Sequence, residues 1–225
     1  MEFVFDKRHY TSAISDRNAR IFDFVPRNDF QGKMMIELGA GIGLPGGDFE
    51  KLGATVVSVE GRAANIEEGK KRFPKRDWHR MDFSKDRLPM PGCFDYVLCL
   101  GLLYHLPNPE KLVKGMPGCL RDGGTIFIST IVRDSDDSDR IDQVVSRGKK
   151  TNHDHHLPDS QGSRFSYAWL EKQLKSTGMT VVDITPERPG SWCFWLHERT
   201  YLNNGEFRRE NHTGHCRKMY MCSTV

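Results

Sequence analysis

The sequence lacks any long run of apolar residues. Its 225 residues are 37% hydrophobic and 28% charged, a balance typical of a soluble globular protein. No apolar run approaches the roughly 18 residues that a membrane-spanning helix needs. The start of the chain, residues 1–8, has no extended apolar core of the kind found in a secretory signal. We therefore expect one domain, residues 1–225, with no membrane partner.

The sequence also has no C-x-x-C pair and no strong excess of charge. Its six cysteines are scattered, which indicates reduced thiols and a cytoplasmic protein. The formal net charge of +3 is too weak and too dispersed to indicate nucleic acid as an obligatory partner, although it leaves RNA open. The oligomeric state does not follow from the sequence.

The most informative stretch that is present is residues 34–43, which reads MMIELGAGIG. Apolar residues lead into Gly39, Gly41 and Gly43, as in a buried strand that ends in a turn with almost no side chains. Glycine permits positive φ and the close approach of a ligand, and open α/β sheets bind ligands at the carboxyl ends of their strands. This stretch therefore predicts a nucleotide-type cofactor site.

Strand-type segments alternate with helix-type segments along the chain, which implies right-handed crossovers and a doubly wound, mostly parallel α/β sheet. The strands are predicted near residues 34–38, 55–60, 77–83, 94–101, 125–130, 179–185 and 217–222, and the helices at 15–24, 44–52, 62–73, 110–120 and 166–176. Three segments break this pattern. Residues 1–30 form a leader that covers a sheet edge or acts as a lid supplying Arg8 or Tyr10, and polar insertions at 131–163 and 186–216 face the ligand.

Two strands end in acids that could bind a nucleoside. Glu60 follows Gly41 by about 20 residues, the spacing expected for a carboxylate that binds ribose hydroxyls. Asp82 and Phe83 end the third strand and could hold an adenine through its amine and its ring. A turn-forming acid is an equal alternative for Asp82.

The pattern G-x-G-x-x-G at residues 41–46 is also compatible with a dinucleotide cofactor. It lies two residues beyond Gly39, however, and Pro45 removes a backbone donor where a helix start would bind a pyrophosphate. The residues thus favour a cofactor without phosphates.

Five motifs follow one another along the chain in the order found in a known family. They are ELGAGIG at 37–43, VEGRAANI at 59–66, MDF at 81–83, FDYVLCLGLLYHLPNP at 94–109 and LRDGGTIFIS at 120–129. Together they resemble the class I S-adenosylmethionine-dependent methyltransferases over roughly residues 33–130. The resemblance implies a seven-stranded Rossmann-like sheet whose last strand is antiparallel.

The resemblance also implies how S-adenosylmethionine would be held. The glycine turn would let the backbone run close to its methionine part, and Glu37 would orient its amino group. Glu60 would bind the ribose, and the backbone of Leu100 would contact the methionyl group. The full implied set is Glu37, Gly39, Ala40, Gly41, Glu60, Gly61, Asp82, Phe83 and Leu100.

The chemistry needs few catalytic groups, because a sulfonium methyl is already activated and the protein must chiefly align a nucleophile with it. A general base matters only for a hydroxyl or a protonated amine. His105 is the nearest candidate base and Tyr104 beside it could line the pocket, but packing is an alternative for both. No metal is required.

The acceptor pocket is expected in the two insertions. His153 and His155 could face the substrate, while the stretch 153–156 could also be a solvated loop or, with further ligands, a metal site. Trp192 and Trp195 could form an aromatic wall or pack on the sheet.

The sequence thus predicts methyl transfer to an oxygen or nitrogen of a small molecule or sugar-like metabolite. An RNA-modifying methyltransferase is one alternative, for which the basic residues are Lys70, Lys71, Arg72, Lys75 and Arg76, all assigned here to an ordinary solvated helix end. A non-catalytic cofactor-binding subunit is another.

Overall fold

A computed structural model describes residues 8–145, 161–186, 201–203, 206–208 and 215–224 of the chain. The helices are α1 (Arg8–Phe22), α2 (Leu44–Glu50), α3 (Ala63–Arg72), α4 (Pro109–Gly115) and α5 (Tyr167–Lys175), with 3₁₀ turns η2 (Arg27–Phe30), η3 (Leu103–His105) and η4 (Met116–Cys119). The strands are β1 (Met34–Leu38), β2 (Thr55–Glu60), β3 (Asp77–Arg80), β4 (Phe94–Leu100), β5 (Leu120–Arg133), β6 (Ile141–Val145), β7 (Gln161–Phe165), β8 (Thr180–Asp183), β9 (Tyr201–Asn203), β10 (Glu206–Arg208) and β11 (His215–Ser223).

Seven strands form the central sheet in the order β3-β2-β1-β4-β5-β11-β8. Pairs among the first five strands are parallel, and β11 is antiparallel to both of its neighbours. The order reverses between β1 and β4, where the carboxyl ends of the strands leave room for a ligand. The predicted doubly wound sheet with an antiparallel last strand is therefore confirmed.

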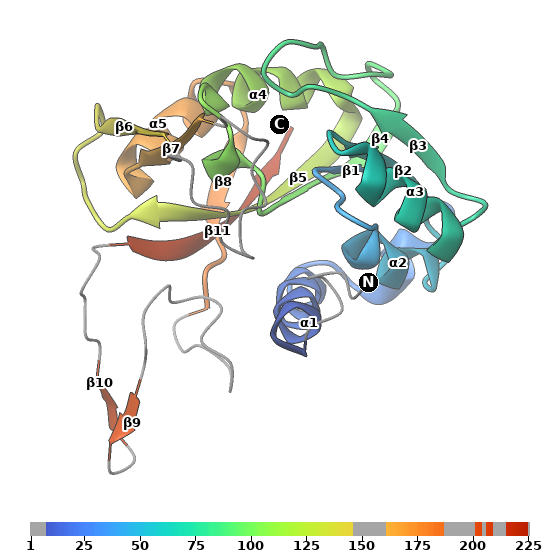
Figure 1. Cartoon of the computed structure of the whole chain (residues 1–225), viewed down its shortest axis with the longest axis horizontal. Coiled ribbons are helices and arrows are strands. Elements are labelled where there is room, and N and C mark those ends of the chain that lie inside the picture. Colours follow the sequence, from blue (N-terminus) through green and yellow to red (C-terminus); the bar gives the residue numbers. More distant parts are fainter. Residues whose placement is uncertain (1–7, 146–160, 187–200, 204–205, 209–214, 225) are drawn as a thin grey trace.

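Helices cover both faces of this sheet (Figure 1). Buried side chains of α4 and α5, such as Leu112 and Leu170, pack in one large core cluster. A second cluster on the opposite face joins Ile21 of α1 and Phe49 of α2 to Leu98 and Phe127 of the sheet. In strands that are buried on both faces a nearly continuous apolar run is expected, and the sequence of β4 has one.

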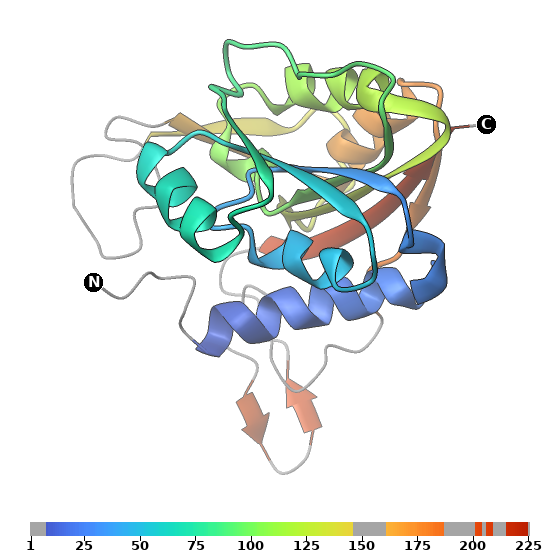
Figure 2. The ribbon, with the colours of Figure 1, turned by 90° about the vertical axis from the view of Figure 1, so that its right-hand side faces the viewer.

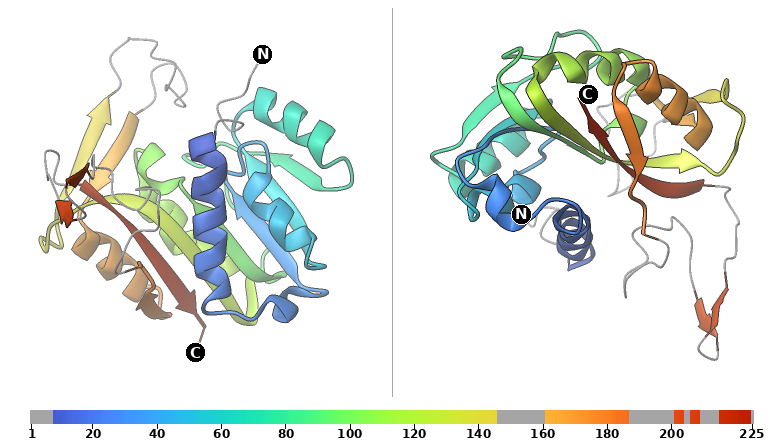
Figure 3. Two further views of the ribbon diagram at one scale, coloured as in Figure 1. Left: turned by 90° about the horizontal axis from the view of Figure 1, so that it is seen from below. Right: turned by 180° about the vertical axis from the view of Figure 1, so that it is seen from behind.

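Two further pairs of strands stand outside the sheet. Strands β6 and β7 form an antiparallel pair, and β9 pairs with β10. The β6–β7 pair extends at the same end of the molecule as the start of α1, as seen from the side in Figure 2 and from below in Figure 3. This end carries the carboxyl ends of the parallel strands.

Several predicted boundaries differ from the structure. Strand β5 begins at Leu120 and continues to Arg133, so residues 131–133 belong to the sheet rather than to a polar insertion. The predicted insertion at 131–163 also contains β6 and the first residues of β7, and its sequence has no convincing period. Helix α4 ends at Gly115 because Pro117 follows in a 3₁₀ turn, and α1 begins earlier than the predicted residue 15.

None of the helices in the described part of the chain has the length and apolar character that crossing a bilayer requires. The five cysteines that the structure describes are free thiols. Burial raises the pKa of the Cys99 thiol to about 12, so this side chain serves as a small apolar core residue.

Candidate functional site

The glycine turn joins β1 to α2 and folds back on β2. Gly39, Gly41 and Gly43 have φ angles of 70°, 59° and 85°, a region that residues with side chains rarely adopt. The backbone N–H groups of Gly39 and Ala40 donate hydrogen bonds to the carbonyl oxygen of Val59 at 2.9 and 3.1 Å. The turn is thus fixed to the end of β2 and presents backbone rather than side chains.

Glu60 is the last residue of β2 and is 8% exposed. Its Oε2 accepts a hydrogen bond from the backbone of Gly41 at 2.9 Å. Its Oε1 accepts from the backbone of Arg62 at 3.0 Å and from Asn65 Nδ2 at 3.3 Å. A carboxylate has about four acceptor sites, so these three bonds leave capacity for a further donor such as a ribose hydroxyl.

Glu37 lies under the start of α2 and is 2% exposed. Its Oε1 accepts a hydrogen bond from the backbone of Gly46 at 3.1 Å, and its Oε2 accepts from Ser58 at 3.3 Å and lies 3.4 Å from Arg76 Nη1. Burial raises the pKa of Glu37 to about 7, although Arg76 and the hydrogen bonds act in the opposite direction. These contacts connect Glu37 to the start of α2, to β2 and to Arg76.

Arg76 holds this region together. Its Nε and Nη2 donate to both carboxylate oxygens of Glu50 at 2.9 and 2.7 Å, and its Nη1 donates to the carbonyl oxygen of Gly43 at 2.7 Å. The guanidinium also lies 3.9 Å from the ring centroid of Phe73. The side chain is fully buried, so the prediction that Arg76 lies on a solvated helix end is wrong.

The end of β4 is the second part of the site. Arg17 of α1 donates from Nη1 to the carbonyl oxygen of Leu100 at 2.7 Å. Gly101 follows with a φ of 101°, and a Cβ there would lie 3.2 Å from Arg17 Nη1 and 3.8 Å from Tyr104 Oη. The Arg17 guanidinium and the Tyr104 hydroxyl thus both lie close to the backbone of Gly101 at the carboxyl end of β4.

Tyr104 and His105 form the short turn η3 after β4, and their ring centroids are 4.1 Å apart. Strand β7 packs against this turn, since a Cβ on Gly162 would lie 2.7 Å from the carbonyl oxygen of Tyr104. Arg164 Nη1 donates to the same oxygen at 3.3 Å. The structure therefore brings the predicted tyrosine next to a cation that the sequence did not point to.

Asp82 lies in a turn after β3. Its Oδ1 accepts a hydrogen bond from the backbone of Ser84 at 3.0 Å, and its Oδ2 lies 3.1 Å from Lys85 Nζ. Both contacts lower the pKa of Asp82, that with Lys85 most. Gly61 lies nearby, because a Cβ there would be 3.3 Å from the carbonyl oxygen of Met81.

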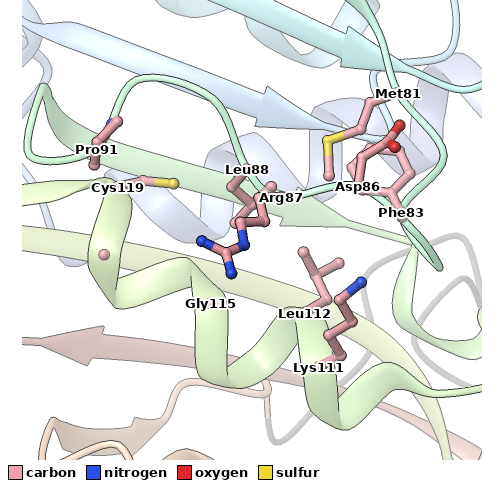
Figure 4. A pocket seen from close by; sticks show the side chains of 11 residues that line it. Met81, Phe83, Asp86, Arg87, Leu88, Pro91, Lys111, Leu112, Gly115 and Cys119 are labelled. Carbon is pink, nitrogen blue, oxygen red and sulfur yellow. The ribbon is translucent and has the colours of Figure 1, made fainter.

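Phe83 is 6% exposed and packs in the large core cluster. It also lines a cavity of about 250 Å³ between the connection that follows β3 and helix α4. Met81, Asp86 and Phe83 lie together on one side of this cavity, across from Lys111 and Leu112 (Figure 4). Phe83 is the one residue of the predicted cofactor set that lines it, and no glycine of the turn at 39–43 does.

A comparison with protein families decides what kind of domain this is. A family model described as a methyltransferase domain matches residues 8–184, well over half of the chain. The chain belongs to this family.

Individual relatives match this methyltransferase domain in part. The ubiquinone biosynthesis O-methyltransferase of Colwellia psychrerythraea is 27% identical over 109 residues, 47% of this chain and 44% of that protein. The tRNA U34 carboxymethyltransferase of Nautilia profundicola is 28% identical over 114 residues, 49% of this chain and 36% of that protein. The chain spans about half the length of the curated relatives it matches.

Solved structures agree with the methyltransferase fold. The N-terminal domain of EvdMO1, solved in the presence of SAH and D-fucose, is 20% identical and has a TM-score of 0.66. The match covers 100% of this chain and 90% of that one.

Some predicted residues of the methyltransferase domain fall outside the described part of the chain. These are His153, His155, Trp192 and Trp195, together with the side chains of Arg8 and Tyr10. Within the described part, no group of three or more His, Cys, Asp or Glu side chains could hold a metal ion.

The structure places two arginines in the site whose buried positions were not predicted. The sequence could have indicated that of Arg17, since Ala13, Arg17 and Ile21 recur every four residues on the buried stripe of α1. No local pattern indicates that of Arg76, because its burial depends on two acids from distant segments, Glu37 and Glu50.

Proposed function

We propose that this domain transfers a methyl group from S-adenosylmethionine to an oxygen or nitrogen of a small molecule or sugar-like metabolite. The observation that carries the proposal is the glycine turn closed by Glu60. Its carboxylate lies 2.9 Å from the N–H of Gly41 and keeps capacity for another donor. The glycine turn and Glu60 together suit a nucleoside cofactor. Its ribose would bind the Glu60 carboxylate, and the rest of the cofactor would lie along the backbone of the turn.

Glu37 supports a cofactor without phosphates. The backbone N–H of Gly46, in the first turn of α2, is already used by Glu37 at 3.1 Å. In phosphate-binding turns such N–H groups instead face the ligand. A buried acid beneath them would also repel a pyrophosphate whenever it is ionised.

Arg17 supports the placing of the methionine part at the end of β4. Its guanidinium donates a hydrogen bond to the carbonyl oxygen of Leu100 and lies close to Gly101, which has no side chain. A carboxylate there would gain a charge-assisted hydrogen bond, while the carbonyl oxygen of Leu100 suits an amino group. Asp82 and Phe83 remain the proposed adenine contacts, along with the backbone at Gly61.

When bound, the cofactor supplies an activated methyl carbon, which leaves the sulfur as the acceptor atom forms its bond. The chain must then orient the acceptor and exclude water, which can lower the barrier by about 7 to 11 kcal/mol. Tyr104 is proposed to line this pocket. His105 is proposed to take the proton of a hydroxyl or ammonium acceptor.

The relatives support small-molecule O-methylation, because several of them are named ubiquinone biosynthesis O-methyltransferases.

Calorimetry with S-adenosylhomocysteine tests the cofactor site. We expect Glu60→Ala to weaken binding about tenfold or more, because hydrogen bonds to charged groups contribute roughly 1.5 to 3 kcal/mol. Glu60→Gln, which keeps the shape and one acceptor oxygen, should lose less. Glu67→Ala, an exposed acid on α3, serves as the matched control and should bind as the wild type does.

An unchanged affinity in Glu60→Ala, with the fold verified by thermal unfolding, would refute this site. Binding of S-adenosylhomocysteine without any transfer from labelled S-adenosylmethionine to a metabolite library would favour the alternative of a non-catalytic cofactor-binding subunit.

A further inference from the structure

Two arginines that the proposed reaction does not use lie near the ring of Tyr104. The Cζ atoms of Arg164 and Arg217 lie 5.7 and 5.8 Å from the centroid of its ring. They come from β7 and β11, which are far apart in the sequence. Two cations near one aromatic ring repel each other, and an anion bound close to both would offset this repulsion.

Arg133 adds a third positive charge. It lies on β5 opposite His215, while Arg217 lies opposite Ile131. In an antiparallel pair such diagonal positions share a face of the sheet. Arg133 and Arg217 therefore belong to the same face.

Arg164 is partly buried and lacks an acidic partner within the described residues. Its Nη1 donates to two backbone carbonyl oxygens, those of Ser163 at 2.9 Å and Tyr104 at 3.3 Å. Burial lowers the pKa of Arg164, and the nearby charge of Arg133 lowers it further against the opposing effect of Tyr104. A half-buried cation whose described hydrogen bonds all go to carbonyl oxygens suits an anion as a further partner.

The described acid nearest to this group, Asp142, is paired with Arg133 and not with Arg164. Asp142 on β6 lies 2.7 Å from Arg133 Nε and 3.7 Å from Arg140 Nε, so one carboxylate is divided between two arginines. It stands opposite Arg164 in the β6–β7 register but makes no described ion pair with it. The group formed by Arg133, Arg164 and Arg217, named here the arginine cluster, thus contains one arginine, Arg164, that makes no ion pair with a described acid.

The arginine cluster lies beside the proposed site of methyl transfer. Tyr104 Oη is close to Gly101 and to Arg17 at the end of β4, whereas the ring of Tyr104 meets Arg164 and Arg217. Tyr104 therefore connects the end of β4 to the cluster within the length of one side chain.

We propose that the arginine cluster is the binding site for an oxyanion of the acceptor substrate, either a carboxylate or a phosphate ester. The acceptor is then an acidic metabolite whose anionic group is held by Arg164 and Arg217 and whose nucleophile reaches past Tyr104. Guanidinium groups suit both oxyanions, because their planar fork can donate two parallel hydrogen bonds. That this site receives the methyl acceptor rests on the proposed function. That it binds an oxyanion is a separate statement, which can be tested by itself.

Calorimetry with matched small probes tests the inference. Phenyl phosphate and benzoate are titrated into the protein saturated with S-adenosylhomocysteine, with benzyl alcohol as the neutral counterpart. We expect at least one anion to bind and the alcohol not to, and the better anion identifies the group. Arg164→Gln and Arg217→Gln should each weaken anion binding about tenfold or more while the affinity for S-adenosylhomocysteine stays within twofold.

Arg80→Gln is the matched control. It removes an exposed arginine of β3, at the opposite edge of the sheet, and should bind the anions as the wild type does. Arg164→Lys keeps the charge but not the fork and should fall between Arg164→Gln and the wild type. This comparison decides the matter even if Arg217→Gln fails to fold.

The inference is overturned if neither anion binds, if benzyl alcohol binds as well as they do, or if Arg164→Gln binds the anions with unchanged affinity. Failure of S-adenosylhomocysteine to bind the wild type would instead contradict the proposed function. The same anion titrations on the ligand-free protein would then still decide the present inference.

Discussion

At the scale of single residues, Glu37 is an acid in the described part of the chain whose ionisation the fold changes strongly. Burial raises its pKa from 4.5 to about 7. The folded protein therefore holds this proton more tightly than the unfolded chain does. The resulting contribution to the free energy of unfolding is full below about pH 4.5 and is lost as the pH rises through about 7.

Glu37→Gln should remove this pH dependence, because an amide does not titrate. Urea unfolding at pH 5 and pH 8 measures it. Between these values we expect the free energy of unfolding of the wild type to fall by about 2 to 3 kcal/mol more than that of the variant. Glu67→Gln, at an exposed position, should behave as the wild type does. Parallel pH profiles for the wild type and Glu37→Gln would show that Glu37 titrates normally.

The residue scale also separates what the sequence could predict from what it could not. The position of Glu60 beside the glycine turn was predictable, because it depends on a short spacing from Gly41 within one βαβ unit. Arg164 and Arg217 were not, because their meeting at Tyr104 depends on the pairing of β11 with β5 and on how β7 packs. Neither the register nor the packing leaves a local pattern in the sequence.

At the scale of elements, strand β7 is seated directly on the turn η3. Gly162 is the contact point, and a Cβ there would lie only 2.7 Å from the carbonyl oxygen of Tyr104. Real Cβ atoms do not come so close to backbone, so the strand or the turn must move if a side chain is added. The position of Arg164, two residues later, depends on this close approach.

Gly162→Ala should therefore destabilise the protein and weaken anion binding at the arginine cluster together. Overpacking of this kind costs about 1 to 3 kcal/mol in the free energy of unfolding, which urea denaturation measures. Gly118→Ala is the matched control, since a Cβ at Gly118 meets nothing within 4 Å. A Gly162→Ala protein with wild-type stability would mean that β7 is not seated on η3 as described.

The elements of the central sheet were predicted well because each is a local pattern. The β-branched run of β2 and the apolar run of β4 specify strands by themselves. Strand β6 was missed, since its five residues carry no clear alternation. Among the described strands it pairs with β7 alone, from which residues 146–160 separate it. Pairing across such a distance is set by tertiary contacts.

At the scale of the whole molecule, the distribution of charge bears on the alternative of an RNA substrate. The basic residues of α3 looked like a candidate surface for RNA. Glu68 lies 3.5 Å from Lys71 Nζ and 2.8 Å from Arg72 Nε, and Arg76 is buried. The partial match to a tRNA-modifying relative is therefore not accompanied by a strong basic face on this helix.

Transfer RNA binding tests this alternative for the chain as a whole. With a net charge of +3 and α3 partly neutralised, we expect only non-specific affinity at physiological salt, with dissociation constants of about 10⁻⁴ to 10⁻⁶ M. Fluorescence anisotropy with labelled tRNA at 50 and 200 mM salt measures both the affinity and its salt dependence. A Lys70→Ala, Lys71→Ala double variant should then change little. Nanomolar binding at physiological salt that this variant abolishes would instead make RNA the substrate, because only a specific protein–RNA interface retains such affinity when phosphate contacts are screened.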